Sequence, residues 1–426
     1  MGARQSVLVT YVSAGITALW LLSGRSVGPL VSLVLLLGAL TSFAFVLHNA
    51  ERVRLTHIAV LGATLLSIAV VLAPRDSRDV YMYAMFGSIL GNHEESPYLH
   101  SPEEFPSDPF LNETTPGWRH VRSPYGPGFA LASGGVVVVS QGSATLARVI
   151  FQAMGALALA TSAFAIHRRG RDRRSVVVLL LNPATIAMVN GGHNDLLVAA
   201  LLVFALLATR SARPVVVGLL LASAVSIKIT AGLPVAALLG WLWFQNRKKA
   251  VRVTVVCASL TAVLYIVAGP THVAGSIRDS AMVTSRASLW SLPSHFLSDT
   301  VLLALAGACV PAVAYVVWRH FRRGSAATAV AVMALVPSIL SPYVLPWYGA
   351  PALFLAALSG PERLRWAACA PAAALLLAYV NPPGASNEGL FAVVSAFALP
   401  SAALLVVVVL RRATAVRPVA PSPKAI

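Results

Sequence analysis

Two aspartates, Asp76 and Asp79, stand at the end of about twenty apolar residues, in the segment RDSRDVYMYAMFG (75–87). Because they are three residues apart, a helix would place both on one face together with Tyr83 and Phe86. A carboxylate at the membrane edge could act as a general base that takes a proton from a hydroxyl nucleophile. Alternatively, Asp79 could be a helix N-cap, since aspartate is favoured in the first turn, and a cap would also hold the carboxylate still.

The motif GGHND (191–195) supplies a second group of polar side chains at the end of an apolar segment. His193 could donate a hydrogen bond to a phosphate, and Asp195 could bind a sugar hydroxyl or orient His193. The simpler interpretation is that Asn194 or Asp195 caps the next helix while the glycines form the turn. Three consecutive hydrogen-bonding side chains are more than one cap needs, so both interpretations remain open.

Lys228 lies inside an apolar run, in SIKITAGLP (226–234). An ionisable residue within a membrane segment is a functional candidate by default, and this lysine could hold the phosphate of a lipid carrier. It could also snorkel to the membrane surface. Arg286 and His295 are further phosphate candidates, although basic residues near the surface often meet lipid headgroups instead.

A fourth motif, SPYVLPWYGAP (341–351), places Tyr343, Trp347 and Tyr348 near one end of an apolar segment. Such aromatic residues are typical of the belt at the membrane–water interface. The alternative is a surface on which a sugar face stacks, or a groove for a prenyl chain. Two prolines within this stretch indicate shaped backbone, which membranes tolerate only beside protein or a cavity.

The composition identifies a membrane protein. The 426 residues are 57% hydrophobic and 11% charged, with a mean hydropathy of +0.77, whereas soluble domains carry roughly 25% charged residues. The net charge of +17 does not indicate a nucleic-acid partner, because the basic residues form short runs between apolar segments. These runs suit the anionic membrane surface, so membrane lipids are the expected partners. The three cysteines lie in apolar segments and show no CxxC spacing, so we expect neither a disulfide framework nor a zinc site.

About thirteen to fifteen hydrophobic segments could cross a membrane, and all should be helical because open sheet edges cannot face lipid. The candidates are 6–23, 28–48, 55–74, 143–167, 175–190, 195–210, 214–229, 231–245, 252–269, 297–318, 325–342, 345–359, 365–381 and 388–410, with 127–141 as a weaker one. We expect one polytopic domain over 1–410, followed by a cytoplasmic tail over 411–426.

The basic residues also predict orientation. Arg52 and Arg54 mark a cytoplasmic loop, so the segment 75–126 should lie outside. If 127–141 crossed the membrane, the run RRGRDRR (168–174) would fall outside, so this glycine-rich segment is expected to be re-entrant or to lie flat. The other segments expected outside are GGHND, 270–296, the region around SPYVLPWY, and 381–389.

The outer segment 75–126 carries eight of the fifteen acidic residues, all within 76–113. It has about fifty residues without a strong apolar period, and loops of that length are usually functional. Its carboxylates match no ligand set for a divalent ion, so no metal site is assigned, although a metal requirement stays open. The second large outer segment is 270–296.

Taken in order, these motifs resemble the GT-C membrane glycosyltransferases of actinobacteria. The order is an aspartate at the outer end of an early span, then VYMY, GNHEESPY, SPYGP, LNP with GGHND, a lysine-containing helix, and Pro-Trp-Tyr near the end. The most similar types are the polyprenol-phosphomannose-dependent α-mannosyltransferases of lipoarabinomannan and phosphatidylinositol-mannoside assembly, which include glycosyltransferase family 87 and its relatives. The resemblance covers most of 60–350.

The resemblance implies an all-α integral membrane protein with a GT-C-type helical bundle, whose long first extracytoplasmic loop carries the catalytic aspartate. Asp79 matches that position. The spacing here is Asp-x-x-Asp rather than Asp-x-Asp, so Asp76 could share the role. The tyrosines of the matching motifs, Tyr83, Tyr98 and Tyr125, are substrate-binding candidates on the same grounds. The usual asparagine before Pro-Tyr is a serine here. The family implies a lipid-phosphate-linked sugar donor as co-substrate, with no cofactor.

We therefore expect an enzyme that transfers a hexose, most simply mannose, from a polyprenyl-phosphate donor to a glycolipid or cell-envelope polysaccharide hydroxyl. The reaction would occur on the outer face of the plasma membrane, with Asp79 as the base. One alternative is an arabinosyltransferase that uses a decaprenyl-phosphate donor. Another is a flippase or transporter of lipid-linked sugars, which should carry charged residues inside the spans of both halves. Only Lys228 is clearly mid-span, and the polar groups gather on one face of the membrane, an asymmetry that favours an enzyme.

Overall fold

The computed structural model describes residues 2–24, 26–170, 172–210, 213–281, 283–321, 324–379, 399–400 and 402–403. Every regular element within these ranges is a helix, which confirms the expected all-α fold. The helices are α1 (Ala3–Ser23), α2 (Pro29–His48), α3 (Leu55–Val71), α4 (Asp79–Gly91), α5 (Pro127–Ser140), α6 (Ala144–Gly170), α7 (Arg173–Leu180), α8 (Pro183–Asn190), α9 (Asp195–Ala208), α10 (Pro214–Ile227), α11 (Gly232–Gln245), α12 (Arg247–Ala268), α13 (Pro270–Ala281), α14 (Asp299–Phe321), α15 (Ala326–Leu340), α16 (Ala350–Ser359) and α17 (Glu362–Ala378).

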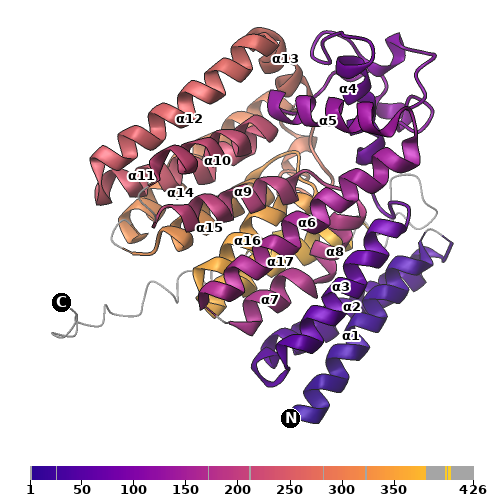
Figure 1. Ribbon diagram of the computed structural model, residues 1–426, viewed down its shortest axis with the longest axis vertical. Coiled ribbons are helices and arrows are strands. Elements are labelled where there is room, and N and C mark those ends of the chain that lie inside the picture. Colours follow the sequence, from indigo (N-terminus) through magenta and orange to yellow (C-terminus); the bar gives the residue numbers. More distant parts are fainter. Residues whose placement is uncertain are drawn as a thin grey trace.

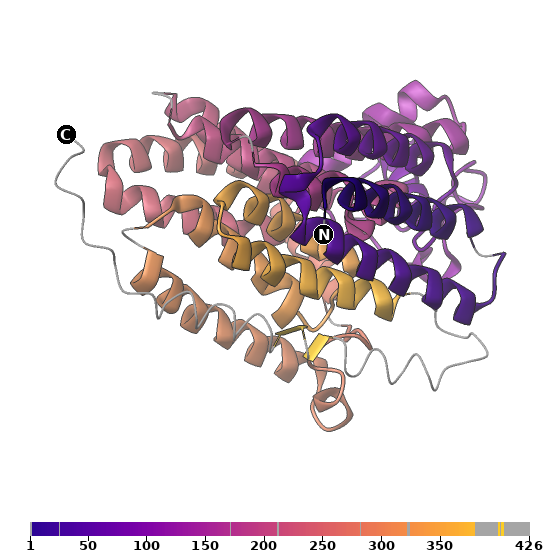
Figure 2. The same cartoon turned by 90° about the horizontal axis from the view of Figure 1, so that it is seen from below.

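The helices form one bundle (Figure 1). The hairpin of α1 and α2 lies with α3 at one edge, α11 and α12 lie at the opposite edge, and α6, α8 and α17 lie between them. Seen from below, the long helices run side by side in layers (Figure 2). The main core of buried apolar side chains extends through α1 to α3, α6 to α11 and α15 to α17.

Five helices are long and apolar enough to cross a membrane, namely α1, α2, α6, α12 and α14. A sixth span could be formed by α8 and α9, which are bent by 118° at the GGHND turn. Large apolar side chains are exposed on these helices, for example Phe164, Val267 and Val34, as expected for surfaces that face lipid. The protein is therefore a polytopic membrane protein. The expected span 388–410 lies outside the described residues, apart from 399–400 and 402–403.

The expected span 175–190 is wrong, because it consists of two short helices, α7 and α8. The break lies at Asn182, whose side-chain oxygen accepts a hydrogen bond from the backbone N–H of Ala184 at 3.0 Å. Pro183 occupies the first position of α8. A capping asparagine followed by proline is a standard helix start, and it interrupts an otherwise continuous apolar run.

The two outer segments also contain helices that the sequence analysis treated as loop. The first forms α4, which crosses α5 so closely that a Cβ at Gly87 would lie 2.4 Å from the backbone oxygen of Ser133. The second segment begins with α13, which follows Gly269 in a backbone conformation with φ of +83°. These helices are short, and α4 is held both by its buried apolar side chains and by the close approach at Gly87.

Loops assigned to the two sides of the membrane gather at opposite ends of the bundle. At one end, Arg173 donates to the backbone oxygen of Glu51 at 2.7 Å, and Arg174 pairs with Glu362 at 3.0 Å. Helix α3 starts beside this group and leads to the other end, where the segments 72–78, GGHND and 340–349 lie. The grouping agrees with the positive-inside assignment of the loops.

Candidate active site

Four segments that are far apart in the sequence bring polar side chains together at one end of the bundle. They are the first turn of α4, the turn between α8 and α9, the break between α10 and α11, and the short 3-10 helix η6 (Pro346–Gly349). The contacts that join them run from Asp79 to His193, from His193 to Trp347, and from Lys228 to Asp195.

Asp79 is the first residue of α4, and its backbone N–H donates to the hydroxyl of Ser77 at 3.2 Å. The N-cap position belongs to Arg78, so Asp79 is not the cap that the simpler interpretation assumed. Its side chain is 19% exposed, and its Oδ2 lies 3.6 Å from Nδ1 of His193. Burial raises the pKa of Asp79 to about 6, against the lowering influence of the Ser77 hydroxyl and of Lys228. A carboxyl with such a pKa is matched to accepting a proton near neutral pH.

His193 is held by two glycines and one aromatic ring. A Cβ at Gly191 would lie 2.2 Å from Nε2 of His193, so the imidazole occupies the space that any other residue would fill. Gly192 has a φ of +62°, and a Cβ there would meet Val80 of α4 at 2.4 Å. The other contact is a parallel stack on Trp347, with ring centroids 3.6 Å apart and an interplanar angle of 12°. Within the described residues, Nδ1 of His193 has no hydrogen-bond partner.

Asn194 and Asp195 do not serve only as helix caps. Asn194 occupies the N-cap position of α9, but its side chain makes no capping hydrogen bond. It is 1% exposed, and neither its amide nitrogen nor its amide oxygen finds a partner in the part of the chain that the structure describes. Buried polar atoms are nearly always paired, so the unpaired amide marks unused hydrogen-bonding capacity at this site. Of the two interpretations of Asp195, the one in which it orients His193 does not hold, because its carboxylate accepts hydrogen bonds from Lys228.

The apolar neighbours of Lys228 predicted that it lies inside a span. In the structure it lies at the break between α10 and the 3-10 turn that precedes α11. Its backbone is extended, with φ of −151° and ψ of 126°, which ends α10. The ammonium donates to both carboxylate oxygens of Asp195, at 2.8 and 2.9 Å, and lies 4.2 Å from the ring centroid of Tyr348. The side chain is only 10% exposed, so it does not snorkel to the surface. Two of its three N–H donors are thus committed to Asp195.

The motif YGPG (125–128) fixes the backbone just before Lys228. The N–H of Gly126 donates to the backbone oxygen of Ile227 at 3.0 Å. A Cβ at Gly126 would lie 2.3 Å from the backbone oxygen of Ser226, and one at Gly128 would lie 2.3 Å from its hydroxyl. Only glycine permits this approach, so the motif acts as a clamp on the end of α10.

The tyrosine candidates of the outer segments are buried around α4. Tyr83 packs edge-to-face on Tyr125, with ring centroids 5.0 Å apart. The hydroxyl of Tyr98 donates to the backbone oxygen of Tyr125 at 3.0 Å, so Tyr98 supports the YGPG motif. Asp76 precedes α4 and lies 3.5 Å from Nε of Arg75, so the expected helix face shared by the two aspartates does not exist.

Trp347 and Tyr348 are placed inside the protein, and each ring has a protein side chain on one face. Trp347 is 6% exposed and carries His193, while Tyr348 carries the Lys228 ammonium. This placement argues against the aromatic belt for these two residues. Arg286 and His295 are exposed, and His295 hydrogen-bonds the backbone oxygens of Ser291 and Leu292 in its own turn. No contact joins either of them to the Asp79 cluster in the described part of the chain.

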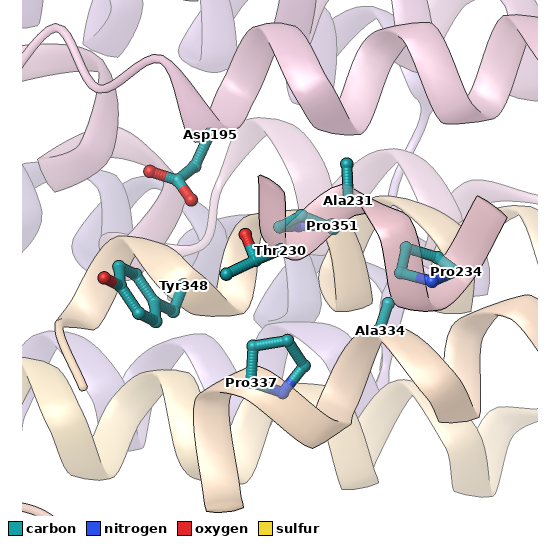
Figure 3. A pocket seen from close by; sticks show the side chains of 8 residues that line it. All are labelled: Asp195, Thr230, Ala231, Pro234, Ala334, Pro337, Tyr348 and Pro351. Atoms are coloured by element: carbon teal, nitrogen blue, oxygen red, sulfur yellow. The ribbon is translucent and has the colours of Figure 1, made fainter. Parts of the chain in front are cut away.

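A small pocket adjoins the Lys228–Asp195 pair (Figure 3). It lies between Asp195, the start of α11, α15 and the start of α16, and prolines line much of it. Its volume of about 10 Å³ is room for about one water molecule, so a sugar does not fit there. Among the charged side chains of the cluster, that of Asp79 is the most exposed, at 19%.

Sequence reasoning missed several polar residues behind the cluster. Arg148 and Gln152 of α6, Asn190 at the end of α8, and Arg75 are buried and connect α3, α6 and α8 by hydrogen bonds. The visible signal was the polar pair Arg148 and Gln152, four residues apart within an apolar helix, which places them on one face.

The arrangement suits acceptance of a proton by Asp79 in a partly closed site. Asp79, Asp195 and Lys228 together carry a net charge of −1 when both carboxyls are ionised, so an anionic substrate group would need Lys228 to exchange partners or further cations. Among the described residues, no three His, Cys, Asp or Glu side chains are placed to hold a metal ion.

Comparison with known proteins agrees with the fold. Residues 4–245, more than half of the chain, match the family model described as alpha-(1->6)-mannopyranosyltransferase, N-terminal domain. An alpha-(1->6)-mannopyranosyltransferase A of Mycobacterium tuberculosis is 27% identical over 420 residues, covering 90% of this chain and 77% of the relative. A protein of the same name from Corynebacterium glutamicum is 31% identical over 167 residues, covering 38% of this chain and 34% of the relative. No solved structure matches.

The matched region contains Asp79, the clamp motif, GGHND and Lys228, whereas Trp347 lies beyond it. With the all-helical membrane fold and a site built around a carboxylate of raised pKa, these matches support one conclusion. The chain belongs to the alpha-(1->6)-mannopyranosyltransferase family of actinobacterial membrane glycosyltransferases.

Proposed function

We propose that this enzyme transfers mannose from a polyprenyl-phosphate donor to a hydroxyl of a glycolipid or cell-envelope polysaccharide, on the outer face of the plasma membrane. Asp79 is the general base. The observation that carries the proposal is the partly exposed Asp79 carboxyl, with a pKa raised to about 6, facing an unpaired His193 nitrogen. The α-(1→6) linkage in the names of the relatives is the linkage proposed for the product.

Each step draws on residues of the site. Asp79 takes the proton from the acceptor hydroxyl as its oxygen attacks the anomeric carbon of mannose, and the bond to the phosphate oxygen breaks. The departing phosphate is an anion, and Lys228 is the buried cation nearest to Asp79 in this cluster. The unpaired amide of Asn194 and Nδ1 of His193 are available to sugar hydroxyls.

The outer location is inferred from charge. Asp79, GGHND and Lys228 lie at the end of the bundle opposite the basic loops, and basic loops are typical of the cytoplasmic side. A donor with a long prenyl chain stays in the membrane, so its reactive carbon lies at the depth of these side chains. The same assignment puts the C-terminal tail on the cytoplasmic side.

The test is transfer of radiolabelled mannose from polyprenyl-phosphate mannose in membranes that contain wild type, Asp79→Asn or Asp76→Asn. Asp76 is a matched control, because its carboxylate is three residues away and 20% exposed. We expect Asp79→Asn to lower the rate by about 10²–10⁴-fold, the range for loss of a general base, and Asp76→Asn to retain most of the activity.

Two further arms address the alternatives. Decaprenyl-phosphate arabinose replaces the mannose donor in one, and movement of the donor across sealed vesicles is measured in the other. Transfer of arabinose but not mannose would overturn the choice of sugar. Donor movement without any transfer would overturn the proposal that the protein is an enzyme. Full activity of Asp79→Asn would show that another residue is the base.

A further inference from the structure

The segment 72–78, which leads from α3 to Asp79, is held by side chains that the proposed reaction does not use. The last carbonyl groups of a helix have no partner within the helix. At the end of α3, the amide of Asn190 donates to the backbone oxygens of Ala69 at 3.1 Å and Ala73 at 3.2 Å. The amide of Gln152 donates to the backbone oxygen of Leu72 at 3.0 Å. These contacts satisfy carbonyls that would otherwise be unpaired in the core.

The donors are buried and fixed in turn. Gln152 is 0% exposed and Asn190 is 2% exposed. Arg148, one turn before Gln152 on α6, donates to the Gln152 side-chain oxygen and to the backbone oxygen of Leu72, both at 2.7 Å. Because the arginine occupies the amide oxygen, the amide nitrogen of Gln152 must point to the carbonyls. The network therefore has one arrangement.

The same two residues contact both backbone segments that carry the active-site pair. The side-chain oxygen of Asn190 accepts from the backbone N–H of Arg75 at 2.7 Å, four residues before Asp79. The Gln152 amide also donates to the backbone oxygen of Asn190 at 2.5 Å, three residues before His193. A shift of either side chain would thus move Asp79 relative to His193.

We propose that Gln152 and Asn190 are positioning residues that hold the Asp79 carboxylate at its distance from His193. The inference rests on the proposed function of Asp79 as the base. A purely structural network would be the alternative, in which the side chains stabilise the bundle without setting the geometry of the site. The positioning role and the purely structural role predict different pH profiles of kcat/KM and different accessibility of the segment 72–78 to a labelling reagent.

The first measurement compares Gln152→Met with Ser162→Ala. The methionine keeps the length of the side chain and removes its hydrogen bonds. Ser162 is a matched control, since it is buried on the same helix and its hydroxyl makes no hydrogen bond within the described residues. We expect Gln152→Met to lower kcat/KM by about 10–100-fold, because misplacement by about 1 Å can have that effect. Ser162→Ala should leave it unchanged.

The pH profile separates positioning from loss of folded protein. If the segment loosens, Asp79 gains water and the acid limb of kcat/KM should move down by about 1 pH unit. The other titratable groups that face Asp79 are His193, Asp195, Lys228 and nearby tyrosine hydroxyls, and the tyrosines do not titrate in this range. A profile lowered by the same factor at every pH would indicate a structural role and overturn the proposal. Asn190→Leu repeats the test if Gln152→Met does not fold, because leucine is similar in size to asparagine, makes none of its hydrogen bonds and adds no charge.

A second measurement does not depend on activity. Ser77 is buried, so Ser77→Cys, in a chain with Cys257→Ala, Cys309→Ala and Cys369→Ala, should react slowly with a membrane-impermeant maleimide. We expect Gln152→Met to raise the labelling rate at least about tenfold, as for a segment that opens locally, and Ser162→Ala to leave it unchanged. An unchanged labelling rate in both would overturn the proposal. Faster labelling together with a fully active Asp79→Asn would show instead that the base assignment has failed.

Discussion

Both ends of the helical bundle carry buried charged groups, but they use them differently. At the basic end, Arg365 is 2% exposed and bonds to Asp172 and to the backbone oxygen of Gly360. Asp172 also caps α7 by accepting from the backbone N–H of Arg174 at 2.9 Å. Arg365 and Arg174 thus each pair with a carboxylate, and these interactions join α7 to α17.

At the other end, the pairing is incomplete. Lys228 and Asp195 form a closed pair, but Asp79 is 3.6 Å from His193, which is longer than a hydrogen bond. Neither amide atom of Asn194 has a partner within the described residues. Polar groups left unpaired beside a partly exposed carboxylate are available to a substrate. The difference thus separates the end proposed to be catalytic from the basic end.

The largest expected effect concerns Lys228→Met. It leaves the Asp195 carboxylate buried without a counter-charge, which destabilises by about 3–5 kcal/mol. It also removes the cation proposed for the phosphate, so transfer should fall by about 10²–10³-fold. Apparent melting temperature in detergent and transfer rate are the measurements.

The double variant Lys228→Met with Asp195→Leu is the control for this prediction. It should recover the melting temperature, because no lone charge remains, and stay inactive. Recovery of transfer in the double variant would mean that the pair is structural, like the one at the basic end.

The second expected effect is a pH dependence of transfer that arises from Asp79 and not from the basic end of the bundle. With a pKa of about 6, Asp79 is mostly ionised at pH 7 and mostly protonated at pH 5, so kcat/KM should fall about tenfold between them. The loss occurs on lowering the pH, because only the ionised carboxylate accepts a proton. A rate that stays constant down to pH 4 would contradict the raised pKa.

The smallest expected effect on transfer is that of Arg365→Met at the basic end. The variant loses the bonds to Asp172 and Gly360, so the free energy of unfolding should fall by about 2 kcal/mol, within the usual range for buried polar losses. The transfer rate per folded molecule should stay within about twofold of wild type. A selective loss of kcat with unchanged melting temperature would show that the two ends are coupled.

Much of the fold was predictable because a membrane span leaves a long apolar signal. The expected segments 28–48 and 231–245 agree with α2 and α11 to within a residue or two. Helix α4 left no such signal, because it is short, although its apolar side chains are buried in a core cluster of their own. The break between α7 and α8 could have been found from Asn182 followed by Pro183.

The site was predictable in its members and not in its pairings. Residue type and position at the end of an apolar run singled out Asp79, His193 and Lys228, and the structure places these three candidates near one another. Their partners depend on how distant helices pack, so neither interpretation of Asp195 included its pairing with Lys228. The buried hydrogen bonds of Gln152 likewise depend on the neighbouring helix ends, which sequence periodicity does not place.

Gly191 and Gly192, the two glycines before His193, differ in the substitutions that each position could tolerate. At Gly191 the obstacle is the imidazole itself, so a methyl group there becomes possible once residue 193 is small, and the two positions form an epistatic pair. At Gly192 the positive φ disfavours any side chain, so a smaller neighbour at Val80 cannot act as a full suppressor. A lineage that gave up the histidine would be free to drift at Gly191 and would still have to keep Gly192.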